Sequence, residues 1–227
     1  MPFPLFRKHY AGRNIVFGIL LIDLAEFTGF GWYKRLVSAV WKTKSKSKDP
    51  GASKKNDAIT LLRDIKNPGF FNENSDITVY EFFDYNCGYC KSVVEPIMDV
   101  ISEDKKVDFV FVEFPILSQS SYIAATAALA AEKQGLYNDF HLSLMKKRGR
   151  ITEDVIFNIA EKTGLNINQL KIDMRSKEIE NKLKKNRDVA KLLNLNGTPA
   201  FIIGDIIYPG ALQKSNLKQM IKSFREK

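Results

Sequence analysis

The chain has 227 residues, of which 44% are hydrophobic and 27% are charged, a composition that is ordinary for a soluble globular domain with an appendage. Its net charge of +9 is concentrated at one end. Residues 1–56 carry 11 Lys/Arg and 3 Asp/Glu (+8), whereas residues 57–227 carry 24 Lys/Arg and 23 Asp/Glu (+1). A nucleic-acid-binding domain usually keeps its basic charge on the folded part, so we expect no nucleic-acid partner.

The N-terminal segment, residues 1–41, resembles an export signal. Basic residues precede an apolar run over residues 15–22, which is the order of the n-region and h-region of such a signal. Asp23 and Glu26 follow the run. Because intramembrane carboxylates are costly, residues 15–33 are only marginal as a membrane-spanning helix.

Three interpretations of this segment remain open. It is an inner-membrane anchor formed by residues 15–33, an unusual signal peptide, or an amphipathic helix that assembles a homo-oligomer through residues 1–56. Residues 42–56 are small, polar and rich in lysine, and they predict a flexible basic linker. We expect the folded domain to occupy residues 57–227.

The first part of this domain predicts a βαβ unit. Residues 77–83 are rich in β-branched and aromatic side chains and predict a buried strand. A helix is expected from about Cys87 to Ser102, with a kink at Pro96, and a second strand over residues 107–113. A strand, a helix of this length and another strand imply parallel pairing with a right-handed crossover.

A helical block is expected over residues 118–195. Residues 122–132 are rich in alanine, which favours helix. Thr152 is a suitable N-cap, and Gly164 is suited to end the helix that Thr152 begins. Residues 168–193 predict one or two further helices.

The C-terminal part predicts a hairpin and a final helix. Two apolar stretches, residues 200–203 and 206–208, flank Gly204-Asp205, which is a turn signal. The last helix is expected over about residues 214–225. The complete order is βαβ, a block of helices, and ββα, which indicates an α/β fold.

The only two cysteines, Cys87 and Cys90, are spaced as C-x-x-C. A zinc site needs four ligands, and the sequence contains no second cysteine or histidine pair. A disulfide across so short a loop constrains the unfolded chain little. A redox pair fits better, since the turn from strand to helix places Cys87 at a helix N-terminus, where a thiolate is stabilised. Cys87 would attack a substrate disulfide and Cys90 would resolve the mixed disulfide.

These residues resemble the DsbA family of thiol–disulfide oxidoreductases, and most closely its suppressor-of-copper-sensitivity and Com1-like branch. The resemblance covers about residues 60–227 and implies a thioredoxin fold with an inserted helical domain. The matching stretches are VYEFFDYNCGYCK (residues 79–91), FPIL (114–117) and GTPAF (197–201).

The resemblance assigns Glu81 to the family's buried acid, six residues before the nucleophile. An ionised carboxylate is costly to bury, so we expect a raised pKa and a proton relay with Cys90. The alternative is an edge-strand residue that faces water. Asp84 has no catalytic role that we can derive from the sequence, and His141 is interpreted as an ordinary helix residue.

The resemblance also assigns Thr198-Pro199 to the cis-proline loop that binds substrate peptide beside the cysteines. Tyr89 replaces the histidine of the best-known DsbA motif, so we expect a less acidic Cys87 and a less oxidising protein. No cofactor and no metal are implied.

The sequence therefore predicts an enzyme of the periplasm or cell envelope that forms or isomerises disulfides. Its partners would be proteins with thiols or disulfides and a membrane redox protein. A dedicated reductase for one client is the alternative within the same chemistry. A redox-silent peptide-binding module is the alternative from another class, although such a module has no use for two cysteines.

Overall fold

The structure is a computed structural model, and it describes residues 50–226. The predicted segment 1–41 and the first part of the predicted linker, residues 42–49, lie outside the described residues. Within residues 50–226, the structure contains no helix that is both long enough and apolar enough to cross a membrane.

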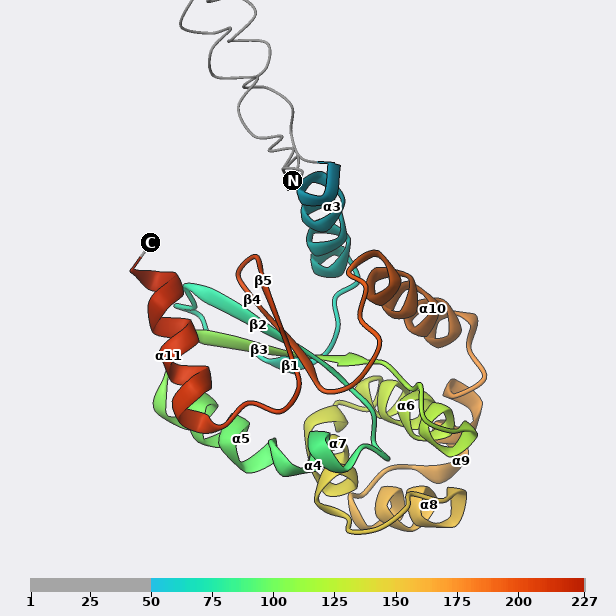
Figure 1. The fold of residues 1–227 in the computed structure, drawn as a ribbon. Helices are drawn as coiled ribbons and strands as arrows, with labels where there is room; N and C mark the ends of the chain where they lie inside the picture. Colours follow the sequence, from blue (N-terminus) through green and yellow to red (C-terminus); the bar gives the residue numbers. More distant parts are fainter. Residues whose placement is uncertain (1–49, 227) are drawn as a thin grey trace, which may run out of the picture. The chain divides into compact units, whose positions relative to one another are not determined.

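A five-stranded sheet in the order β1-β3-β2-β4-β5 forms the centre of the domain (Figure 1). Strands β2 (Ile77–Phe83) and β3 (Val107–Glu113) are parallel, as predicted. Strand β4 (Ala200–Ile203) pairs antiparallel with β2, and β5 (Ile206–Pro209) pairs antiparallel with β4, which confirms the predicted hairpin. Strand β1 (Gly69–Phe70) pairs antiparallel with β3; it was not predicted, because two residues are too short to show an alternating pattern.

The predicted helix after β2 is present but broken. Helix α4 (Gly88–Ser92) is followed by α5 (Val94–Glu103), and the break lies at Val93. Because Pro96 has no N–H group to donate to the carbonyl of Ser92, the helical ladder is interrupted one turn before the proline.

The helices expected between β3 and β4 are also present: α6 (Gln119–Glu132), α7 (Tyr137–Lys146), α8 (Glu153–Lys162), α9 (Ile167–Asp173) and α10 (Lys177–Leu192). Thr152 caps α8 by accepting a hydrogen bond from the N–H of Val155, and Gly164 has a φ of +86° just after its end. Helix α11 (Lys214–Arg225) ends the domain. The fold is the thioredoxin fold with inserted helices, as predicted.

The sequence prediction is wrong for residues 50–56. These residues belong to helix α3 (Pro50–Asp64) and not to a flexible linker. Ala58, Ile59 and Leu62 recur with helical spacing and are buried in one cluster with α10 and one face of the sheet. Packing of this apolar stripe stabilises a helix that the polar composition of its first turns does not suggest.

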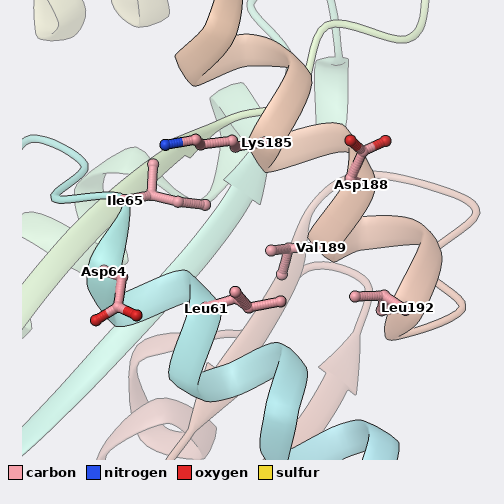
Figure 2. A pocket seen from close by; sticks show the side chains of 7 residues that line it. All are labelled: Leu61, Asp64, Ile65, Lys185, Asp188, Val189 and Leu192. Carbon is pink, nitrogen blue, oxygen red and sulfur yellow. The ribbon is translucent and has the colours of Figure 1, made fainter.

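A groove of about 250 Å³ lies between α3 and α10. Figure 2 shows its lining residues: Leu61, Asp64, Ile65, Lys185, Asp188, Val189 and Leu192. Neither cysteine is among them, so this groove does not contribute to the chemistry of the C-x-x-C pair.

Candidate active site

Cys87 and Cys90 lie at the turn between β2 and α4. Cys87 is the N-cap of α4, with extended backbone angles (φ −80°, ψ 117°), and its Sγ atom accepts a hydrogen bond from the N–H of Cys90 over 3.4 Å. Cys87 is 6% exposed and Cys90 is completely buried, and both are free thiols. This arrangement leaves only Cys87 within reach of a substrate.

The two thiols differ strongly in acidity. Hydrogen bonding by the side chain of Cys90, with further bonds from Thr198 and from the backbone N–H groups of Cys90 and Tyr89, lowers the pKa of Cys87 to about 5, against the opposing effect of burial. Burial raises the pKa of Cys90 far above its usual range, and the hydrogen bond to Cys87 and the charge of Glu81 raise it further. At neutral pH Cys87 is therefore the thiolate and Cys90 the thiol.

The loop before β4 faces the cysteines. The Thr198–Pro199 peptide bond is cis, as the resemblance implies, and the thiol of Cys87 donates a hydrogen bond to the carbonyl of Thr198 over 3.3 Å. Pairing of β2 with β4 brings this loop to the turn. Tyr89 is 73% exposed, so its ring is available to a bound partner.

Glu81 lies in the central strand β2 and is 1% exposed, which excludes an edge-strand residue that faces water. In the sheet it stands between Phe111 of β3 and Phe201 of β4, and within the described part of the chain its Oε1 atom has no hydrogen-bond partner. Burial raises the pKa of Glu81 to about 8, and the nearby Cys87 contributes. The carboxyl group can therefore hold or release a proton near neutral pH, as expected.

A second buried polar cluster, which the sequence analysis missed, lies next to the turn. The hydroxyl of Tyr85 donates to Glu113 Oε1 over 2.9 Å and lies 3.0 Å from His141 Nδ1, and Tyr137 donates to the same Oε1 over 2.9 Å. Burial raises the pKa of Glu113 well above its ordinary value and lowers the pKa of His141 to about 3, so burial disfavours the charged form of each side chain. Tyr137 and His141 are four residues apart on one face of a helix, a spacing that could have indicated their proximity.

Asp84 and Asn86 hold the turn in place. Asp84 is buried, and its carboxylate accepts hydrogen bonds from the N–H groups of Asn86, Ile116 and Leu117 over 2.8–3.0 Å. Asn86 donates to the hydroxyls of a serine cluster at the start of α6. Asp84 thus joins the turn to the loop after β3, because its side chain binds backbone N–H groups of both segments.

In the described part of the chain, no group of three or more His, Cys, Asp or Glu side chains is arranged to hold a metal ion. The dithiol itself supplies the two electrons that a disulfide exchange requires.

Comparison with known proteins identifies a matching family and similar proteins. The family model of the DSBA-like thioredoxin domain matches residues 78–222. The chain is 29% identical over 166 residues to a probable disulfide bond formation protein D of Bacillus anthracis, an alignment that covers 66% of this chain and 76% of that protein.

Several solved structures are also similar to this chain. A thioredoxin-like oxidoreductase from Silicibacter pomeroyi is 37% identical, with a TM-score of 0.71 over 74% of this chain and 97% of that one. The catalytic domain of Proteus mirabilis ScsC is 26% identical (TM-score 0.68; 78% and 98% covered). A periplasmic thioredoxin-like protein from Salmonella enterica serovar Typhimurium is 27% identical (TM-score 0.67; 80% and 100% covered).

Proposed function

Because the chain belongs to the DSBA-like thioredoxin domain family of thiol–disulfide oxidoreductases, we propose that it is exported and that it forms or isomerises disulfides in proteins of the cell envelope. The observation that carries this proposal is the asymmetry of the two thiols: an accessible Cys87 with a pKa of about 5 beside a buried Cys90 with a strongly raised pKa. A nucleophile and a resolving thiol need this difference.

In the exchange, the Cys87 thiolate attacks one sulfur of a client disulfide and releases the other as a thiolate. Cys90 then loses its proton and attacks the sulfur of Cys87. The Cys87–Cys90 disulfide forms, the client dithiol leaves, and two electrons have passed from the enzyme to the client. The reverse sequence oxidises a client, and both together isomerise one.

Glu81 accepts the proton of Cys90 in the resolving step and returns it in the reverse step. A buried carboxyl with a pKa of about 8 is suited to this work near neutral pH. Thr198 and Pro199 offer backbone to the client segment around its cysteine, and Tyr89 presents an exposed ring to the same segment.

Two observations support the proposed location. The Salmonella enterica relative is a periplasmic protein, and residues 1–41 have the order of charges and apolar residues of an export signal. We propose that residues 15–33 anchor the protein in the inner membrane, where a membrane redox protein resets its dithiol. Full-length protein should then sediment with membranes, whereas soluble full-length oligomers would favour oligomerisation through residues 1–56.

The decisive experiment compares two cysteine variants. Cys87→Ser should abolish reduction of insulin and refolding of a scrambled substrate, because the nucleophile is lost. Cys90→Ser should instead accumulate mixed disulfides with clients, since the resolving thiol is gone. Near-normal activity of Cys87→Ser in both assays would refute the proposal and would favour a redox-silent peptide-binding module.

The reduction potential of the Cys87–Cys90 couple separates disulfide formation from a dedicated reductase. With Tyr89 in place of histidine, we expect a value between about −120 mV, as for DsbA, and about −270 mV, as for thioredoxin. Tyr89→His should raise the potential. A value at the thioredoxin end would identify a reductase.

A further inference from the structure

A strongly cationic loop lies beside the dithiol. From the last residue of α7 into the stretch before α8, the chain places four cations in five positions: Lys146, Lys147, Arg148 and Arg150. We call residues 146–150 the basic loop. All five residues are exposed, although residues 57–227 as a whole carry a net charge of only +1. The basic loop is therefore a local concentration of positive charge in a domain that is otherwise nearly neutral.

The basic loop is fixed to both ends of the C-x-x-C segment. Lys91, which follows Cys90, donates from Nζ to the carbonyl of Lys147 over 2.7 Å and to the carbonyl of Gly149 over 2.9 Å. Asn86, which precedes Cys87, accepts a hydrogen bond at Oδ1 from the N–H of Ile151 over 2.7 Å. A merely solvated run of charge needs no such anchors, and here they hold the backbone of the basic loop against the residues that flank the C-x-x-C pair.

The charge of the basic loop is largely uncompensated. Over residues 50–226, Lys146 forms an ion pair with Glu95 at 3.7 Å, and Lys147, Arg148 and Arg150 form none. The buried carboxylate of Asp84 is already bonded to three backbone N–H groups. These three cations are thus available to a partner.

The loop after β3 also borders the turn, and it presents apolar side chains instead of cations. Ile116 and Leu117 are 40% and 53% exposed, and their N–H groups are held by Asp84. Together with the exposed ring of Tyr89, they supply apolar contacts. A client segment at Cys87 therefore meets both apolar and cationic groups.

We propose that the basic loop selects client proteins whose reactive cysteine is flanked by Asp or Glu. This inference rests on the proposed thiol–disulfide exchange and adds its substrate class. At 0.1 M salt the screening length is about 10 Å, so the charge of the loop acts on client carboxylates that lie within about that distance of it. Charges at the rim of an interface act mainly on the association rate and its salt dependence, so the preference should appear in the second-order rate constant.

The test uses the full-length reduced protein and three model peptides, each carrying one mixed disulfide with a chromogenic thiol. Glu, Ser or Lys residues flank the peptide cysteine. Rates are measured at about 0.01 M and about 1 M salt, where the screening length is about 30 Å and about 3 Å. The loop variant is Arg148→Gln/Arg150→Gln. The control, Arg175→Gln/Arg187→Gln, removes the same charge from exposed arginines outside the basic loop.

We expect the wild-type protein to reduce the Glu peptide about tenfold faster than the Ser peptide at low salt, with the difference lost at high salt. The loop variant should lose most of this preference and keep its rate on the Ser peptide, and the control should behave as wild type. An equal fall for all three peptides would overturn the inference, because the charge would then act on the Cys87 thiolate. The inference would also be overturned if the loop variant reduced the Glu peptide as fast as the wild type does. Absence of exchange by the wild type with every peptide would instead refute the proposed function.

Discussion

The thiol of Cys87 donates a hydrogen bond to the backbone carbonyl of Thr198 over 3.3 Å, although 111 positions separate the two residues in the chain. Only the protonated sulfur can make this bond, whereas hydrogen bonds from the Cys90 side chain and from backbone N–H groups favour the thiolate. The fraction of Cys87 that is ionised, and with it the reactivity of the site, depends on the balance between the bond to Thr198 and the bonds that favour the thiolate.

The first prediction concerns the pH dependence of Cys87. Its pKa of about 5 lies well below the ordinary thiol value of 9.0, so the rate of alkylation should be constant at neutral pH and fall as the pH drops through about 5. Cys90→Ala should raise the midpoint, because the side-chain hydrogen bond to Cys87 is lost. The measurement is iodoacetamide labelling followed by mass spectrometry, and a wild-type midpoint near 9 would contradict the assignment.

The second prediction concerns Glu81→Gln. The folded-state pKa of Glu81 is raised from 4.5 to about 8, so its contribution to stability is fully present below pH 4.5 and is lost as the pH rises through about 8. Because glutamine does not ionise, the variant does not lose stability over this pH range. Its free energy of unfolding should therefore match that of the wild type near pH 4 and exceed it increasingly up to pH 8.

The same variant should also resolve mixed disulfides more slowly, because Cys90 lacks its proton acceptor. Denaturant unfolding at several pH values and stopped-flow exchange provide the two readouts. A stability difference that does not vary with pH would show that Glu81 is ionised in the folded protein.

The third prediction compares Tyr85→Phe with Tyr137→Phe. Each variant removes a buried hydroxyl that bonds to Glu113 Oε1, so each should lower the free energy of unfolding by about 1–3 kcal/mol. Only Tyr85 also contacts His141 through this hydroxyl and lies in the active-site turn. Tyr85→Phe alone should therefore change the exchange rate, and equal rates in the two variants would argue against this role.

The fourth prediction tests whether α3 belongs to the folded domain. Leu62 is 1% exposed and its neighbour Leu61 is 47% exposed. Leu62→Ala should lower the free energy of unfolding by about 2–5 kcal/mol, whereas Leu61→Ala should change it by less than about 0.5 kcal/mol. If chemical denaturation gave the same small effect for both, α3 would not pack as the structure shows.

Local patterns in the sequence were sufficient for several features of this protein. Strands β2 and β3 show as runs of β-branched and aromatic residues, and Thr152 and Gly164 mark the ends of α8. The burial of Glu81 was expected from the resemblance, and its side chain is 1% exposed in a strand that is buried on both faces. The spacing of Cys87 and Cys90 indicated redox chemistry, because reactive sulfurs one helical turn apart are close in any helix.

Other features depend on contacts between distant parts of the chain and leave no local pattern. Helix α3 is stabilised by burial against α10, so its polar first turns were misread as a linker. His141 was interpreted as an ordinary helix residue, because only the packing of α7 on the sheet places it beside Tyr85. The basic loop is likewise an unremarkable run of charge in the sequence. The hydrogen bonds of Lys91 and Asn86, formed across more than fifty residues, place it beside Cys87, because those anchors exist only in the folded chain.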